Sequence, residues 1–279
     1  MMRVIVTNDD GIDAPGLRAL VRALRDRANV ITVAPAVEWS GAGHNAPSSL
    51  RAIRVERRDD AELGCVFVVH SHPAECVRLA LTELCGARPD LVIAGINLGG
   101  NVGVDVYYSG TVAAAREAAI LGCPAVAVSQ FIRKELPDDW PAASDWTRIV
   151  LDPLLSELRR EAPPAVWNIN LPHLPLGGRP RGIAFAPVAT APLQICYERV
   201  GAVDATTYRY CGAYLSRPAP SGSDVAYLFD DWVTISVLGI SVTACPARHG
   251  EFVWPPDGGL RDTWRPACGS DPQNRAGTG

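Results

Sequence analysis

Short apolar runs alternate with helical segments along the first half of the chain, and this alternation constrains the fold more than any other feature. The runs, rich in β-branched residues, are residues 4–6, 30–33, 66–69, 91–94 and 125–128. Such runs are typical of strands buried on both faces of a sheet. Helical segments lie between most of them, at residues 15–28, 73–85 and 110–121. The pattern predicts an α/β fold with a mainly parallel sheet flanked by helices, whose ligands bind beyond the carboxyl ends of the strands.

The second half of the chain predicts a change of architecture. A helix over residues 140–161 and a strand over 165–171 continue the α/β pattern, but short tyrosine-rich, β-like pieces follow from about residue 187. A β-prone run returns at residues 232–242. We expect three regions: an α/β core (1–186), a smaller β-rich extension whose strand 232–242 returns to the core (187–264), and a flexible tail (265–279).

Charge and hydropathy exclude several partners. The 26 basic and 30 acidic residues give a net charge of −4, which provides no attraction to a nucleic acid polymer or an acidic membrane. The apolar runs are far shorter than the roughly 18 residues of a membrane helix, and the first residues resemble a strand rather than a signal peptide. We therefore expect a cytoplasmic protein. The eight cysteines are scattered and form no CxxC pair, which favours buried thiols over disulfides or a zinc site.

Two adjacent carboxylates, Asp9 and Asp10, come directly after the first predicted strand and before Gly11. Carboxylate oxygens at the end of a buried strand suit a hard divalent cation, which would offset their repulsion. The alternative is a solvated turn that caps the next helix, since Asn and Asp are common there.

Further polar segments follow other predicted strands of the same sheet. Ser109, Gly110 and Thr111 open an alanine-rich helix, whose free amides and hydroxyls could hold phosphate, although Ser109 could also be a simple helix cap. The glycine-rich loop 95–103 permits close approach of an anion but lacks the spacing of a dinucleotide-binding motif. His44, in a polar loop, could bind or transfer a proton, or be structural.

At these residues the chain resembles the survival protein E (SurE) family of metal-dependent nucleotidases and phosphatases. The matching segments, in the family's order, are 6–12, 34–35, 40–44, 89–92, 95–97 and 109–112, and weaker similarity continues to about residue 240. The resemblance implies a Rossmann-like core, a projecting β region and a homodimer or homotetramer. It also implies that one Mg or Mn ion is held by Asp9, Asp10, Ser40 and Asn97. Phosphate would be bound by Asn101, Ser109, Gly110 and Thr111.

The chain departs from the family pattern around the expected substrate. Ser71 and His72 stand where the family has Gly-Thr, Glu75 replaces an Asp, and the apolar segment 185–192 replaces an arginine-rich stretch. We therefore expect an intact metal set beside an altered substrate-binding set, which favours a substrate other than a common nucleotide. The alternative is a housekeeping nucleotidase whose basic contacts come from elsewhere in the chain.

These features together predict hydrolysis of a small phosphomonoester, with Asp9, Asp10 and Asn97 as the catalytic residues. His44 or His72 could assist the leaving oxygen. One alternative is a non-catalytic phosphate-binding relative, against which the complete metal set counts. Another is an unrelated metal-dependent nucleotide-sugar transferase, against which the ordered series of matching segments counts.

Overall fold

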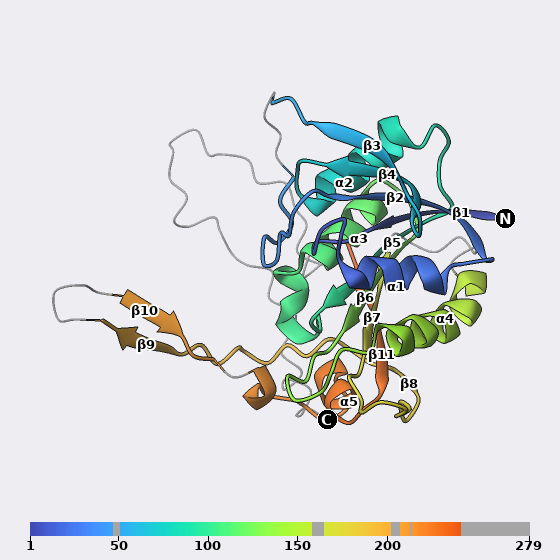
Figure 1. Cartoon of the computed structure of the whole chain (residues 1–279). Helices are drawn as coiled ribbons and strands as arrows, with labels where there is room; N and C mark the ends of the chain where they lie inside the picture. The colour runs from blue at the N-terminus through green and yellow to red at the C-terminus, as the bar shows by residue number, and fades with distance from the viewer. Residues whose placement is uncertain (47–50, 158–164, 202–206, 213, 241–279) are drawn as a thin grey trace, which may run out of the picture. The chain divides into compact units, whose positions relative to one another are not determined.

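A nine-stranded sheet, in the order β3-β4-β2-β1-β5-β6-β7-β11-β8, forms the centre of the computed structural model (Figure 1). Its strands are β1 (Met2–Thr7), β2 (Ala28–Pro35), β3 (Val55–Asp60), β4 (Gly64–Val69), β5 (Leu91–Leu98), β6 (Ala125–Gln130), β7 (Ala165–Leu171), β8 (Ile183–Phe185) and β11 (Val233–Gly239). The six strands from β4 to β7 are parallel, whereas β3 and β11 run antiparallel to β4 and β7. The predicted mainly parallel α/β sheet is therefore confirmed.

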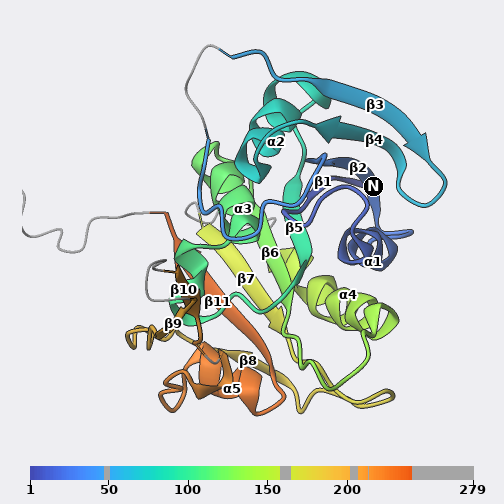
Figure 2. The same cartoon turned by 60° about the vertical axis from the view of Figure 1, so that its left-hand side comes forward.

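Helices cover both faces of the sheet (Figure 2). They are α1 (Pro15–Ala23), α2 (Pro73–Leu79) with a π-helical turn (Ala80–Leu84), α3 (Gly110–Ile120) and α4 (Trp140–Glu157). Alternation along β1 explains the two layers. Val4 and Val6 pack in the core with α1 and α4, while Ile5 packs on the opposite face with α2 and α3. Each fully buried aliphatic side chain contributes about 1.5–3 kcal/mol to stability, so both layers fix the sheet.

The order of the strands creates a crevice at one edge of the sheet. The chain leaves β1 toward β2 and β4, and then returns to β5 on the other side of β1. The segments that follow β1 and β5 therefore diverge, which is where ligands of doubly wound sheets bind. Gly16 in α1 allows close packing beside this crevice, because an added Cβ would lie 2.0 Å from the Ile96 carbonyl oxygen.

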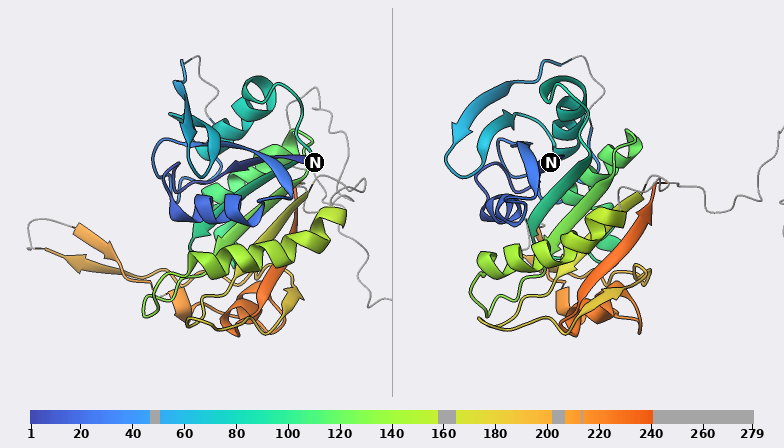
Figure 3. Two further views of the ribbon diagram at one scale, coloured as in Figure 1. Left: turned by 45° about the vertical axis from the view of Figure 1, so that its right-hand side comes forward. Right: turned by 90° about the vertical axis from the view of Figure 1, so that its right-hand side faces the viewer.

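The extension after β7 contains a separate two-stranded antiparallel sheet. It is formed by β9 (Tyr197–Val200) and β10 (Thr207–Tyr210), and Figure 1 shows it reaching away from the main sheet. A 3-10 turn (Tyr214–Ser216) and α5 (Asp224–Phe229) follow before β11 joins the main sheet beside β7 (Figure 3). The domain boundaries at residues 186 and 264 stay predictions.

The structure describes residues 1–46, 51–157, 165–201, 207–212 and 214–240, all within a unit that spans Met1–Ile240. A second unit, Ser241–Gly279, lies outside the described residues, and so does the expected tail. Among the described helices, none combines the length and the hydropathy that crossing a bilayer requires.

Candidate active site

A cavity of about 260 Å³ opens at the crevice between the carboxyl ends of β1 and β5. It is lined by Asp9, Ser40, Gly41, Asn97, Leu98, Gly99, Gly100, Asn101, Asp105, Tyr108, Ser109 and Tyr214. Five residues proposed from the sequence thus meet around one space: Asp9, Ser40, Asn97, Asn101 and Ser109. They meet because their segments follow strands of one parallel sheet at the same edge.

Asp9 lines the cavity and is only 3% exposed. Its Oδ1 accepts a hydrogen bond from the Thr111 hydroxyl. Gly110 lets the start of α3 approach this closely, because an added Cβ would lie 2.7 Å from Asp9 Oδ2. Burial raises the pKa of Asp9 to about 6, the Thr111 bond opposes the rise, and the nearby Asp10 charge adds to it. The carboxylate is therefore held in place at an electrostatic cost.

Asp10 lies next to the cavity, where its Oδ2 accepts a hydrogen bond from the Leu98 amide at 3.1 Å. This bond joins the turn after β1 to the end of β5. Burial raises the pKa of Asp10; the Leu98 amide opposes the rise, and the charge of Glu38 adds to it. Glu38 was not singled out from the sequence, because nothing in its local pattern distinguishes it from an ordinary loop residue.

The glycine-rich loop after β5 is held by a network of amide side chains. Asn97 Nδ2 donates to the Gly99 carbonyl at 2.7 Å, which makes Oδ1 the Asn97 atom that could bind a cation. Asn101 Nδ2 donates to Ser129 Oγ at 2.7 Å, and its backbone amide donates to Asn170 Oδ1 at 2.7 Å. The loop is thus fixed from the adjacent strands β6 and β7.

The start of α3 separates the proposed phosphate-binding residues into two groups. Ser109 lines the cavity and caps the helix, accepting a hydrogen bond from the Val112 amide at 3.0 Å. Thr111 is fully buried, and its hydroxyl is engaged by Asp9. We expected Thr111 to contact phosphate through this hydroxyl, whereas the structure shows it orienting a carboxylate.

His44 and His72 lie outside the residues that line the cavity. His44 Nε2 is 2.7 Å from Glu117 Oε2, and the other carboxylate oxygen, Glu117 Oε1, accepts a hydrogen bond from Arg78 Nε at 2.5 Å. His72 packs against Trp39, with ring centroids 3.9 Å apart, and its Nδ1 is buried without a partner in the described structure. Burial lowers the pKa of His72, which favours the neutral ring. Both histidines therefore make structural contacts, which for His44 was the alternative to binding or transferring a proton.

Tyr214 and Asp105 are cavity residues that sequence reasoning missed. The Tyr214 hydroxyl lies 3.1 Å from the Gly100 carbonyl oxygen and 3.0 Å from Asp105 Oδ2, so one proton is shared between two acceptors. Burial and the Asp105 charge raise the pKa of Tyr214, which keeps the phenol protonated. Arg217 binds both Asp105 oxygens, at 2.6 and 3.2 Å, and covers the Tyr214 ring. This Tyr214 cluster fastens the extension to the glycine-rich loop.

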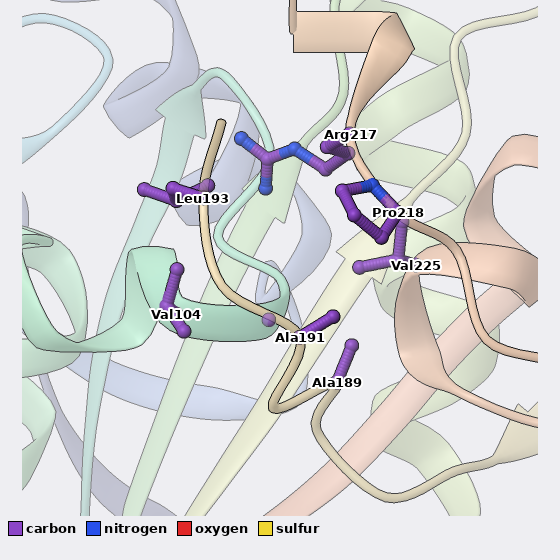
Figure 4. Close-up of a pocket in the computed structure, with 8 residues that line it drawn as sticks. Val104, Ala189, Ala191, Leu193, Arg217, Pro218 and Val225 are labelled. Atoms are coloured by element: carbon purple, nitrogen blue, oxygen red, sulfur yellow. The ribbon is translucent and has the colours of Figure 1, made fainter. Parts of the chain in front are cut away.

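A small second pocket adjoins the cluster (Figure 4). Figure 4 shows Val104 and Leu193 opposite Pro218 and Val225, with Ala189 and Ala191 below. Its volume of about 10 Å³ is that of about one water molecule. Residues 185–192, which we expected to face the substrate, contribute alanines to this pocket and none of the residues that line the larger cavity.

The charges around the larger cavity are one-sided. Asp9 and Asp105 line it, and none of its lining residues in the described part of the chain is Lys, Arg or His. The Arg217 guanidinium neutralises Asp105, which leaves Asp9, with Asp10 beside it, without a basic partner among the described residues that line the cavity. These carboxylates would repel a phosphate placed beside them, and a cation between the two would offset that repulsion.

The donors present fit a hard divalent cation. Asp9, Asp10, Ser40 and Asn97 offer carboxylate, hydroxyl and amide oxygens, the ligands of Mg²⁺ and Mn²⁺. Asn8 Oδ1, beside them in sequence, is buried without a hydrogen-bond partner among the described residues. No cluster of three His, Cys, Asp or Glu residues suited to a metal occurs in the described residues, and the expected set has only two acidic members.

Comparisons with known proteins identify relatives of most of the chain and of its fold. The family model described as "Survival protein SurE" matches residues 4–193. A protein of Nostoc sp. named "Putative 5'-nucleotidase" is 40% identical over 239 residues, covering 86% of this chain and 100% of that protein. A Synechocystis sp. protein of the same name is 39% identical over 240 residues, with the same coverage. The crystal structure of the SurE protein from Aquifex aeolicus superposes with a TM-score of 0.73 at 28% identity, covering 87% of this chain and 95% of that one.

Proposed function

Because the chain belongs to the Survival protein SurE family, we propose that it is a metal-dependent phosphomonoesterase of the 5'-nucleotidase type. The observation that carries this proposal is the cavity itself. Carboxylate and amide oxygens converge on it, and a helix N-terminus borders it at Ser109, but none of the described residues that line it is basic. An acidic cavity of this kind suits a phosphate when a cation is bound with it. The nucleotidase relatives make hydrolysis the reaction that this arrangement serves.

We assign the metal to Asp9, Asp10, Ser40 and Asn97. A bound divalent ion would polarise a phosphoryl oxygen and lower the pKa of a bound water. Asp9 must be ionised to take part, and the Thr111 hydroxyl supports that state by donating to Oδ1. Asp10 keeps the ends of β1 and β5 together through the Leu98 amide, which sets the distance between the carboxylates and the Asn97 amide.

We assign the phosphate to the start of α3 and to the glycine-rich loop. The first amides of a helix have no partner inside the helix, and together with the helix dipole they favour an anion. Ser109 and Asn101 line the cavity and can donate to phosphate oxygens. Gly110 brings these amides next to Asp9, so that a phosphate and the metal carboxylates share one site.

A phosphatase screen with defined metals tests the proposal. Purified protein, stripped of metal, should release phosphate from at least one phosphomonoester when Mg²⁺ or Mn²⁺ is added, and should lose activity again with a chelator. Full turnover in a verified metal-free preparation would contradict the metal assignment. Phosphate binding with metal present but no turnover on any ester would instead indicate the non-catalytic relative.

We also propose that the preferred substrate is less anionic than a common nucleoside phosphate, such as a non-standard nucleotide or a natural-product phosphate. Among the residues that the structure describes, none that lines the cavity is an Arg able to bind a second anionic group, and each such charge-assisted contact contributes about 1.5–3 kcal/mol. The screen should therefore compare specificity constants for ordinary nucleoside monophosphates with those for a varied panel of esters. Uniformly high values for the nucleotides would reject the narrower preference.

For assembly, we propose a symmetric homodimer or homotetramer. Tyr197, Tyr208 and Tyr210 are exposed on the β9–β10 hairpin, and exposed aromatic residues are enriched in interfaces. Tyr214 packs on Phe131 and Tyr227 packs on Trp232, so these two rings already have aromatic partners within the chain. Light scattering at the concentration used for the enzyme assays should give a multiple of 29.8 kDa, and a monomeric mass would reject this assembly.

A further inference from the structure

Two cysteines face each other at the base of the β9–β10 hairpin. Tyr197 pairs with Tyr210 at the end of the two strands, and the Cys211 amide donates to the Cys196 carbonyl at 2.9 Å, which extends the ladder by one rung. The Sγ atoms of Cys196 and Cys211 lie 2.6 Å apart, and both residues are exposed. The backbone register therefore places two accessible thiols within bonding reach of each other.

The other described cysteines are in different surroundings. Cys76 and Cys123 are buried, and burial raises the pKa of Cys123 to about 11, so that this thiol stays protonated. Cys65 accepts a hydrogen bond from Arg57 Nε at 3.1 Å on another strand pair. The expectation that the cysteines are buried thiols is wrong for Cys196 and Cys211, because a rung of a two-stranded sheet has no layer above it to cover its side chains.

We propose that Cys196 and Cys211 are a redox modification site that closes to an intrachain disulfide and opens again under reducing conditions. Neighbouring residues across an antiparallel ladder have the short separation between β-carbons that a disulfide needs. The oxidant would be a small-molecule disulfide of the glutathione type. Because the site is exposed, both the oxidant and a later reductant can reach it, and exposed disulfides are the readily reduced ones.

The reaction proceeds by two thiol–disulfide exchanges. One cysteine, as its thiolate, attacks a sulfur of the oxidant, forming a mixed disulfide and releasing the first thiolate of the oxidant. The second cysteine, after losing its proton, attacks the protein sulfur of that mixed disulfide, forming the Cys196–Cys211 bond and releasing the second thiolate. Two electrons pass from the protein thiols to the oxidant, and two protons pass to the solvent or to the released thiolates.

The bond would join β9 to the segment that leads to the Tyr214 cluster. Cys211 precedes Tyr214 by three residues, and Tyr214 contacts the Gly100 carbonyl at the cavity. The modification site is therefore built into the connection between the hairpin and the active-site rim, although its formation does not depend on the proposed phosphatase activity.

Peptide mapping of the full chain tests the proposal. The reduced protein is equilibrated with defined ratios of oxidised to reduced glutathione, quenched with acid, alkylated and digested with trypsin and chymotrypsin. Trypsin cleaves after Arg199 and Arg209, which puts the two cysteines on separate peptides, and chymotrypsin separates Cys211 from Cys245 by cleaving after Tyr214. We expect a peptide pair linked through Cys196 and Cys211, two fewer alkyl groups per chain, and full reversal with excess reduced glutathione.

Variants make the test specific. Cys196→Ser should leave Cys211 open to alkylation or to a stable mixed disulfide with glutathione, and Cys211→Ser should do the same for Cys196, while Cys85→Ser should leave the linked pair unchanged. The proposal is overturned if both thiols are alkylated at every glutathione ratio. It is also overturned if Cys211 joins Cys245 or a second chain, or if the bond survives excess reduced glutathione.

Discussion

The Thr111 hydroxyl donates a hydrogen bond to Asp9 Oδ1 although the two residues are 102 positions apart in the chain. The bond links the first residue of the proposed metal set to the start of the helix that borders the phosphate site. Because of this bond, the charge state of the Asp9 carboxylate depends on the position of the start of α3. Thr111 therefore contacts the proposed metal set through Asp9 and does not line the cavity, whereas Ser109, two residues earlier, does.

Thr111→Val should weaken metal binding more than substrate binding. A hydrogen bond to a charged group contributes about 1.5–3 kcal/mol, which corresponds to about ten- to a hundredfold in apparent metal affinity. Titration of activity with Mg²⁺ or Mn²⁺ measures this directly. Thr111→Ser, which keeps the hydroxyl, should behave like the unchanged protein, and Ser109→Ala should raise KM instead. If the Thr111 and Ser109 variants changed the apparent metal affinity and KM equally, the separate roles of Thr111 at the metal and Ser109 at the substrate would be rejected.

Gly110→Ala should abolish most of the activity. The added Cβ would lie 2.7 Å from Asp9 Oδ2 and 2.8 Å from Asp9 Cβ, so either the carboxylate or the helix start must move. A displacement of about 1 Å at such a site costs on the order of a hundredfold in rate. Gly239→Ala is the matched control, since nothing lies within 4 Å of a Cβ there. Comparable kcat values for the two variants would show that the close approach is not needed.

Asp9→Asn and Asp10→Asn should each lose most metal-dependent turnover while the protein stays folded. Each change removes one negative charge from the proposed metal set and leaves the size of the side chain nearly unchanged. Asp13→Asn is the control, because Asp13 is an exposed residue of the same turn region and pairs with Arg58. Near-normal activity of both variants across a range of metal concentrations would place the metal elsewhere.

Tyr214→Phe should raise KM several-fold with little change in stability. The ring still packs on Phe131, but the Gly100 carbonyl loses its bond to the hydroxyl, so the glycine-rich loop is held less firmly. Tyr208→Phe, on the exposed hairpin, serves as the control. An unchanged KM in the Tyr214 variant, or an equal rise in the Tyr208 variant, would argue against the role of the Tyr214 cluster.

Glu117 should make stability depend on pH. Burial raises the pKa of this carboxyl, but hydrogen bonds from His44 and Arg78 outweigh the rise and leave the pKa below its ordinary value of 4.5. A carboxyl whose pKa is lowered on folding contributes stability above about pH 4.5 and loses it as the pH falls through the folded pKa. Glu117→Gln should lower the free energy of unfolding by about 1–3 kcal/mol at pH 7, and by less at pH 3.5.

Urea titrations at the two pH values measure this difference. Glu198→Gln is the control, since the exposed Glu198–Arg209 pair is worth less than about 1 kcal/mol. A Glu117 effect that is the same at both pH values would mean that packing, and not charge, is responsible.

The pattern of apolar runs predicted the central strands because a strand buried on both faces has no room for polar side chains. It failed for β3, whose sequence Val-Glu-Arg-Arg-Asp-Asp reads as a charged loop. As an edge strand, β3 pairs with β4 alone among the described strands, and none of its residues is fully buried. Hydropathy therefore carries no signal for β3, and only its hydrogen bonds define it.

The candidate site was predictable where its residues follow neighbouring strands directly. Asp9 and Asn97 come at the ends of β1 and β5, so the order of the strands alone brings them together. Tyr214 reaches the same cavity from the extension, and no local sequence pattern predicts the course of the chain between β7 and this residue. The role of Thr111 was also out of reach, because residue type does not tell which neighbour a hydroxyl will face.

Apart from Tyr214, every residue that lines the cavity lies at or before Ser109. The segments up to Ser109 therefore supply every lining residue but one, and the extension supplies Tyr214. A chimaera of two relatives joined in the connection between β6 and α4, residues 131–139, would inherit all of these lining residues from one parent except Tyr214, which would come from the other. The seam crosses the β6–β7 pairing, where Val126 lies opposite Trp167, so parents that match at this pair should recombine most readily. In this architecture, such an exchange separates the contribution of the extension, made at the cavity through Tyr214, from that of the residues at or before Ser109.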